Sequence, residues 1–146
     1  MIVSDVMSTE VGTVKDNDNL VSAASLMLDL NVGALPVVND GGALAGIITD
    51  RDITIRATAK GANPFSANVA DFMTTNPLSI TADADVEEAA DLMADAQIRR
   101  LPVVQDGQLM GIVSLGDLAV DVGEDEMIAE TLECISEPVH SEHMAA

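Results

Sequence analysis

The sequence has very few basic residues and almost no aromatic ones. Six Lys and Arg stand against 25 Asp and Glu in 146 residues, which gives a formal net charge of −19. Nucleic-acid binding and adsorption to an anionic membrane both need a basic surface, so this charge balance excludes both. We expect such a chain to repel itself at low salt and to come from a halophile, whose salt-rich cytoplasm screens the carboxylates. An ordinary acidic protein is the alternative.

Long hydrophobic runs and paired cysteines are also missing. No apolar run reaches the roughly 18–20 residues that span a bilayer, and no basic segment leads into an apolar one at the N-terminus. The single Cys134 cannot form an internal disulfide, in keeping with a reducing compartment. These absences predict a soluble, cytoplasmic protein. The hydrophobic content of 48% excludes a disordered acidic chain.

The sequence contains an internal repeat. A shift of 66 positions aligns three blocks, and after a gap near Gly41 a shift of 65 positions aligns a fourth. The aligned blocks are 3–9 with 69–75, 23–27 with 89–93, 35–38 with 101–104 and 46–52 with 111–117. Four blocks in the same order indicate two copies of one unit. We assign 1–58 to the first copy, 59–68 to a linker, 69–121 to the second copy and 122–146 to an acidic C-terminal helix and tail.

Each copy predicts a strand, a helix, two strands and a short helix. Apolar residues recur at helical spacing over 20–30 and again over 86–97, where Asp85 offers an N-capping side chain. Each helix is followed by a Leu-Pro-Val-Val run, a turn at 39–42 or 106–107, and a second apolar run that leads into a short helix. A unit of about 60 residues is too small to bury a sufficient core alone. We therefore predict an α+β fold in which two β-α-β-β-α repeats pack with pseudo-twofold symmetry.

The paired blocks resemble tandem CBS (cystathionine-β-synthase) domains, the pair known as a Bateman module. The resemblance covers about residues 1–120. Its most specific elements are the strands Gly-Ala-Leu-Pro-Val-Val and Arg-Arg-Leu-Pro-Val-Val, each followed by Gly-apolar-apolar-Thr/Ser-x-x-Asp. The resemblance implies a non-catalytic sensor that binds adenosine-containing ligands in clefts between its two repeats. It also implies a homodimer in which four CBS domains form a flat disc.

A hydroxyl and a carboxylate recur at the end of the second hairpin strand in both copies. The pairs are Thr49 with Asp52 and Ser114 with Asp117. A carboxylate can accept hydrogen bonds from the two adjacent hydroxyls of a ribose, while the Thr or Ser hydroxyl suits a phosphate oxygen. Plain capping of the following helix is the alternative, and the two roles are compatible. Because both copies carry the pair, we favour ribose binding.

The resemblance also assigns residues of one repeat to the cleft of the other. The cleft of Ser114 and Asp117 would contain Thr13, Val14, Val32, Gly33 and Ala34. The cleft of Thr49 and Asp52 would contain Ser79, Ile80 and Ile98, with Arg99 and Arg100 beside it as phosphate contacts. Small Gly33 and Ala34 leave room for a purine, whereas two arginines narrow the other cleft. An ion pair with Asp95 is the alternative role for one arginine.

We therefore expect a regulatory module with no catalytic residues and no metal site. Its ligand would be AMP, ADP or ATP, ahead of S-adenosylmethionine or NAD(H), and it would act on a partner protein in trans. A ligand-free module that dimerises and recruits other proteins is the main alternative. A third reading is metal sensing through Cys134, His140 and His143.

Overall fold

The two sequence copies exchange their first blocks in the folded chain. The computed structural model describes residues 1–121 and 125–136. Unit 1 contains Met1–Thr9, Ile80–Val103 and the described residues from Gly111 onward, while unit 2 contains Glu10–Ser79 and Val104–Met110. The first block of each copy therefore belongs to the unit that holds the helix of the other copy. The repeats found in the sequence and the compact units of the structure are different divisions of the same chain.

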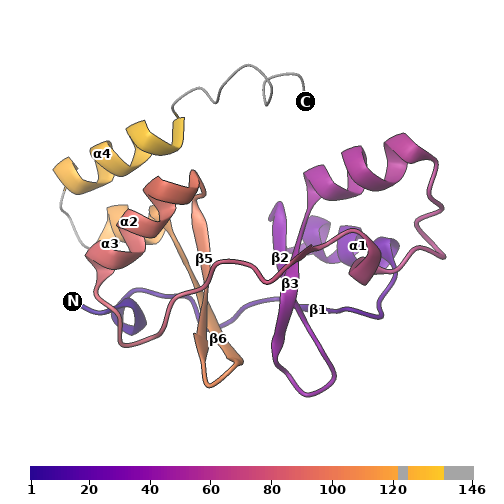
Figure 1. Ribbon diagram of the computed structural model, residues 1–146, viewed down its shortest axis with the longest axis horizontal. Helices are drawn as coiled ribbons and strands as arrows, with labels where there is room; N and C mark the ends of the chain where they lie inside the picture. The colour runs from indigo at the N-terminus through magenta and orange to yellow at the C-terminus, as the bar shows by residue number, and fades with distance from the viewer. Residues whose placement is uncertain (122–124, 137–146) are drawn as a thin grey trace. The chain divides into compact units, whose positions relative to one another are not determined.

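Unit 2 is built on a four-stranded sheet (Figure 1). The strands are β1 (Val14–Lys15), β2 (Ala34–Val38), β3 (Leu44–Thr49) and β4 (Thr74–Thr75), in that spatial order. The first pair is parallel and the other two are antiparallel, so helix α1 (Leu20–Leu30) serves as the crossover between β1 and β2. The buried core joins Leu20, Ala23 and Met27 of α1 to Leu35, Val37 and Ile48 of the sheet.

Unit 1 repeats this arrangement with fewer strand pairs. It contains the 3₁₀ turn η1 (Val3–Asp5), helix α2 (Val86–Ala96), strands β5 (Arg100–Gln105) and β6 (Gln108–Ser114), and helix α3 (Leu115–Asp121). The tip of the β5–β6 hairpin, 104–110, belongs to unit 2. Ile80 pairs with Val103 in a single parallel bridge, which takes the place that β1 has beside β2 in unit 2. The predicted α+β fold with two similar repeats is confirmed.

Both long helices begin at the residues that the sequence predicts. The side chain of Asn19 accepts a hydrogen bond from the Ser22 N–H, and that of Asp85 accepts one from the Glu87 N–H. These caps satisfy backbone donors that have no partner inside the helix. The helices end at Asn31 and Gln97, both in the left-handed region at φ 55°. Local chemistry therefore sets the ends of α1 and α2 alike.

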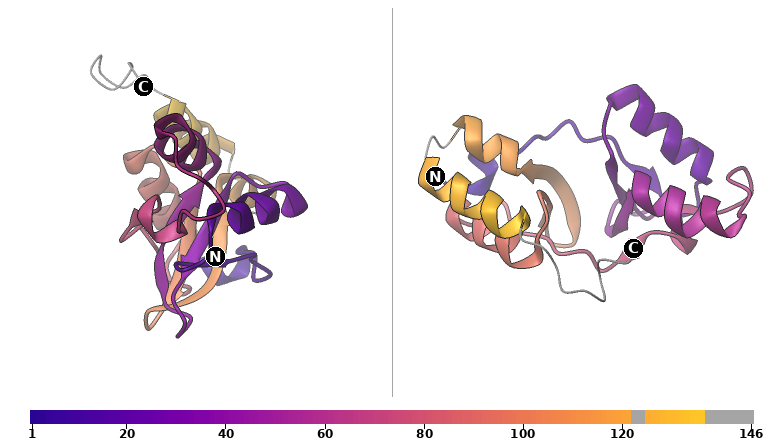
Figure 2. Two further views of the ribbon diagram at one scale, coloured as in Figure 1. Left: turned by 90° about the vertical axis from the view of Figure 1, so that its right-hand side faces the viewer. Right: turned by 90° about the horizontal axis from the view of Figure 1, so that it is seen from above.

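The C-terminal helix α4 (Asp125–Ser136) packs on α2 and α3 of unit 1 (Figures 1 and 2). Met127, Ile128 and Ile135 lie against the buried core of that unit, and the Gln97 side chain donates to the Cys134 carbonyl at 3.1 Å. Their helical spacing places these apolar side chains on one face of α4. Within the described residues, the structure contains no helix with the length and apolar character needed to cross a membrane.

The segment at 59–68, which we assigned to a linker, is hydrogen-bonded to the start of α1. Leu20 N–H donates to the Ala67 carbonyl at 3.1 Å, and Val21 N–H donates to the Pro64 carbonyl at 3.3 Å. The first copy forms a π-helix, η2 (Asp52–Ala57), where the second copy forms α3. A 3₁₀ turn, η3 (Thr58–Lys60), follows η2 and extends into the 59–68 segment. The short helices that follow the two motifs thus differ in type.

Candidate functional site

The two hydroxyl–carboxylate pairs have the same hydrogen-bonding pattern. In unit 2, Thr49 N–H donates to Asp52 Oδ2 at 3.0 Å, and Asp52 N–H donates to Thr49 Oγ1 at 3.0 Å. In unit 1, Ser114 N–H donates to Asp117 Oδ2 at 2.9 Å, and Asp117 N–H donates to Ser114 Oγ at 3.0 Å. Each pair is therefore a helix cap, as the alternative reading predicts. The cap uses only Oδ2, so it leaves Oδ1 of each carboxylate for another partner.

The second residue before each Leu-Pro-Val-Val run lies beside the motif of its own copy. Asp50 N–H donates to the Gly33 carbonyl at 2.9 Å, and Leu115 N–H donates to the Arg99 carbonyl at 2.8 Å. Ala34 pairs directly with Thr49 across β2 and β3. The expected clefts combine each motif with residues that, apart from Ser79, belong to the other unit. That combination stays a prediction.

The space beside Gly33 is already occupied within unit 2. A Cβ atom placed on Gly33 would lie 3.0 Å from Asp50 Oδ2 and 3.3 Å from Asp50 Cγ. The Asp50 carboxylate also accepts the Arg51 N–H at 2.8 Å. The room that we attribute to a small residue at this position is therefore bordered by a carboxylate of the same unit.

The remaining candidate residues divide into core and accessible positions. Val14 and Ile80 are only 4% and 5% exposed and belong to the cores of units 2 and 1, respectively. Their side chains expose little surface, and their assignment to a base pocket stays a prediction. The part-buried candidates are Thr13, Val32 and Ile98, and Ser79 is exposed. None of these four is buried.

Arg99 and Arg100 are exposed, and within the described residues neither forms an ion pair. The pairing with Asp95 that we considered as an alternative is therefore not formed there. Unpaired guanidinium groups can bind phosphate in a bidentate manner. Their position at the start of β5, with Arg99 hydrogen-bonded to Leu115, places them on the unit that carries Ser114 and Asp117.

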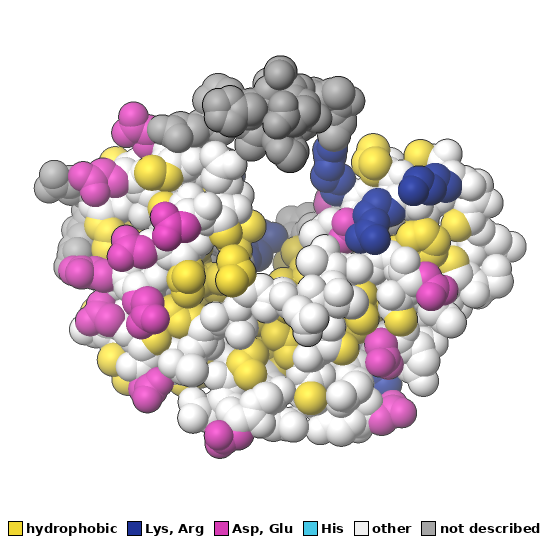
Figure 3. Space-filling view, viewed as in Figure 1, with side chains coloured by type: hydrophobic (Ala, Val, Ile, Leu, Met, Phe, Trp, Pro, Cys, Tyr) yellow, Lys and Arg dark blue, Asp and Glu magenta, His cyan; other side chains and the backbone are white. Residues whose placement is uncertain are grey.

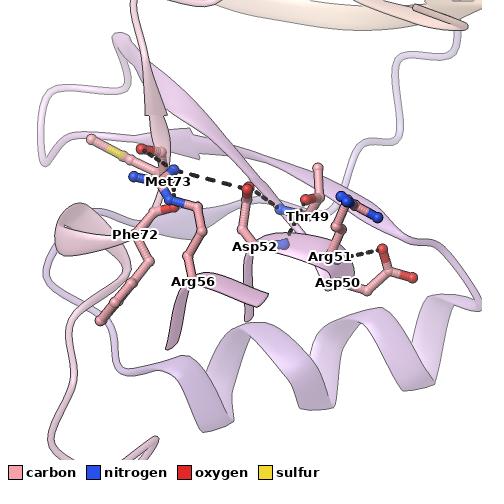
Figure 4. A network of polar contacts seen from close by, with 7 residues as sticks. All are labelled: Thr49, Asp50, Arg51, Asp52, Arg56, Phe72 and Met73. Carbon is pink, nitrogen blue, oxygen red and sulfur yellow. Dashed lines mark hydrogen bonds and ion pairs between the residues drawn. The ribbon is translucent and has the colours of Figure 1, made fainter. Parts of the chain in front are cut away.

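Arg56 takes part in a network that sequence reasoning missed (Figure 4). Its Nη1 donates to the Phe72 carbonyl at 2.8 Å, lies 3.5 Å from the Met73 carbonyl and lies 3.8 Å from Asp52 Oδ1. The signal for the ion pair was present, because Asp52 and Arg56 are four residues apart in a predicted helix. The carbonyl contacts could not be read from the sequence, because Phe72 lies 16 positions away.

Metal binding finds no support in the described part of the chain. No cluster of three or more His, Cys, Asp or Glu side chains there could hold a metal ion. Cys134 is exposed on α4, whereas His140 and His143 lie outside the described residues. The metal-sensing alternative therefore falls largely on residues for which the structure gives no geometry.

Comparison with known protein families decides the family. A model of the CBS domain matches residues 3–57 and 69–124. The chain belongs to the CBS domain family. The matched segments correspond to the two copies in the sequence, so the chain is a tandem CBS protein. CBS domains are generally regulatory modules, and the comparisons indicate no enzyme family.

Two relatives are similar to this chain over most of its length. The CBS domain-containing protein YhcV of Bacillus subtilis is 46% identical over 134 residues, which are 92% of this chain and 94% of the relative. Hypoxic response protein 1 of Mycobacterium tuberculosis is 33% identical over 124 residues, covering 85% of this chain and 87% of the relative. The crystal structure of Hypoxic Response Protein I with two coordinated zinc ions has a TM-score of 0.78 and covers 83% of this chain and 98% of its own.

Two similar solved structures contain adenosine ligands. CBSX2 in complex with AMP aligns with a TM-score of 0.74 at 29% identity, over 86% of this chain and 98% of its own. The CBS domain pair of protein MJ0100, in complex with 5′-methylthioadenosine and S-adenosyl-L-methionine, has a TM-score of 0.74 at 30% identity and the same coverage. CBS pairs of this fold thus include proteins that bind adenosine-containing molecules.

Proposed function

We propose that this tandem CBS protein is a non-catalytic regulatory module that binds an adenosine-containing ligand. AMP, ADP and ATP are the leading candidates, ahead of S-adenosylmethionine and NAD(H). The observation that carries the proposal is the Asp117 carboxylate. Its Oδ2 is held by the cap, and within the described residues its Oδ1 has no donor, which suits it to accept from a ribose hydroxyl.

The arginines support a phosphate-bearing ligand in particular. The chain carries a net charge of −19, so an anion approaching it needs local positive charge to overcome the repulsion. Arg99 and Arg100 supply two adjacent guanidinium groups without ion-pair partners among the described residues. We assign phosphate contacts to these arginines and to the Ser114 and Thr49 hydroxyls. We assign base contacts to Thr13, Val14, Val32, Gly33, Ala34, Ser79, Ile80 and Ile98.

Regulation would pass from the bound ligand to another protein. A ligand shifts an equilibrium between two arrangements only by binding one of them better. We propose that the protein is a homodimer and that ligand binding shifts its two repeats relative to each other. A partner protein in trans would bind one of the two arrangements in preference to the other. The acidic composition and the single cysteine support a salt-rich, reducing cytoplasm as its environment.

Calorimetric titration with AMP, ATP, NADH and S-adenosylmethionine in high-salt buffer tests the proposal. We expect heat and a thermal shift with at least one adenine nucleotide. Asp117→Asn should abolish most of the binding, because asparagine keeps an oxygen for the cap but replaces the second acceptor with an NH₂ group. Asp52→Asn is the matched variant in the other unit and should weaken binding less. The absence of binding heat and of a thermal shift with all four ligands would contradict the proposal.

A ligand-free dimerisation module is the second candidate. The observation in its favour is that both hydroxyl–carboxylate pairs already have a structural role as helix caps. Such a module would dimerise to the same extent with and without nucleotide and would show no binding heat. Light scattering during the same titrations separates the two candidates.

A further inference from the structure

Arg56 distinguishes the two motifs. Its Nη1 lies 3.8 Å from Asp52 Oδ1, and the Asp52 carboxylate already accepts the Thr49 N–H through Oδ2 (Figure 4). Both oxygens of Asp52 therefore face donor groups of the chain itself. The matching position in the second copy carries Asp121, which has no positive charge to offer Asp117.

The guanidinium is held in this place by more than the carboxylate. It donates to the Phe72 carbonyl at 2.8 Å and lies 3.5 Å from the Met73 carbonyl, two acceptors that precede β4. The Asp52 side chain is only 16% exposed, so water screens the pair less than it would on an open surface. A ribose that approached Asp52 Oδ1 would have to compete with a tethered cation for the same lone pairs.

A second difference surrounds the first motif. The residue after Thr49 is Asp50, whose carboxylate lies against Gly33 and accepts the Arg51 N–H. The residue after Ser114 is Leu115, which is buried in the core of unit 1. The first motif thus has an additional carboxylate beside it, at the position where the second motif has a buried leucine.

We propose that Arg56 keeps ribose away from Asp52, so that each chain binds one adenosine ligand, at Ser114 and Asp117. This inference rests on the proposed function and adds the stoichiometry and the residue that sets it. Arg56 acts here as a specificity-determining residue, because its charge lies 3.8 Å from a carboxylate oxygen whose equivalent on Asp117 has no donor among the described residues. Removing its charge opens a second site with the same hydroxyl and carboxylate.

Titration of the full chain with AMP and, separately, with 5′-methylthioadenosine tests this inference. We expect one equivalent per wild-type chain and two equivalents for Arg56→Ala. Arg56→Gln keeps a donor for the Phe72 carbonyl but lacks the charge. It should also bind two equivalents, and it replaces the alanine variant in the test if that variant unfolds. Arg51→Ala is the matched control, since Arg51 is an exposed arginine of the same segment without an ion pair among the described residues, and it should stay at one equivalent.

The reverse substitution gives an independent test. Asp121→Arg places an arginine four residues after Asp117 and should weaken the wild-type site at least tenfold. A second equivalent of the uncharged methylthioadenosine in Arg56→Ala would show that the effect acts on ribose rather than on phosphate. Two equivalents in the wild type, or one in both Arg56 variants, would overturn the inference while leaving the proposed function intact. No binding in any variant would overturn both.

Discussion

At the scale of single residues, two glycines permit the exchange of first blocks. A Cβ atom on Gly46 would lie 2.5 Å from the Thr74 carbonyl oxygen, and one on Gly111 would lie 2.5 Å from that of Ser8. These contacts accompany the pairing of Gly46 with Thr75 and the bridge between Ser8 and Ile112. Each first block approaches its hairpin strand so closely that only glycine leaves enough room.

Gly111→Ala should therefore destabilise the protein by about 1–3 kcal/mol, as overpacking against backbone does. The first block of unit 1 would have to move away from β6, because its backbone cannot rotate aside as a side chain can. Gly116→Ala is the control, since its Cβ would meet only Ser114 Oγ at 3.6 Å. The control should be neutral, or stabilising by up to about 1 kcal/mol through helix propensity. Equal urea midpoints for the two variants would contradict this prediction.

At the scale of elements, α4 is held on unit 1 by packing of its apolar face, in addition to its own helix propensity. Its apolar face lies on α2 and α3, and Thr131 is 4% exposed, with its hydroxyl donating to the Met127 carbonyl at 2.8 Å. Glu87, Glu88 and Asp91 of α2 are all exposed. Figure 3 shows many acidic side chains on the surface of unit 1. The helix α4 therefore packs through apolar contacts within an otherwise strongly acidic unit.

Two substitutions on α4 should separate its inner and outer faces. Ile128→Ala removes a side chain that packs on the core of unit 1 and should lower the free energy of unfolding by about 1–2 kcal/mol. Leu132→Ala alters a side chain that is 42% exposed and should cost less than about 0.5 kcal/mol. Urea denaturation followed by circular dichroism measures both. A larger loss for Leu132→Ala would mean that another surface covers this residue in solution.

At the scale of the whole molecule, most acidic side chains have no basic side chain to pair with, because 25 Asp and Glu stand against six Lys and Arg. The described residues form two ion pairs, Lys15 with Asp40 at 3.3 Å and Arg56 with Asp52 at 3.8 Å. Both side chains of the Lys15–Asp40 pair are exposed, so this pair contributes little to stability. Most of the 25 acidic side chains therefore depend on solvent cations rather than on protein cations for compensation.

Stability should accordingly rise with salt. Between 0.05 and 0.5 M KCl the Debye length falls from about 14 to about 4 Å, so carboxylate repulsion is largely screened. We expect Tm to increase by roughly 5 °C over this range, and NaCl to act in the same way because screening does not depend on the cation. A further increase above 1 M would favour adaptation to a salt-rich cytoplasm. An unchanged or falling Tm would show that repulsion between carboxylates does not limit stability.

The sequence by itself determined the features that depend on neighbours along the chain. The internal repeat, the caps at Asn19 and Asp85, and the pairing of Thr49 with Asp52 all follow from residues within four positions of one another or from direct comparison of the copies. Such contacts recur wherever the local pattern recurs, which is why the fold could be predicted.

Tertiary structure alone decided which distant segments meet. The Ser8 bridge to Ile112 joins residues more than 100 positions apart, and the Phe72 carbonyl holds Arg56 across 16 positions. Nothing in the local pattern selects these partners, because they are set by where the strands place backbone groups in space. The two copies therefore look alike in sequence, while the packing around Arg56 makes the surroundings of Asp52 and Asp117 different.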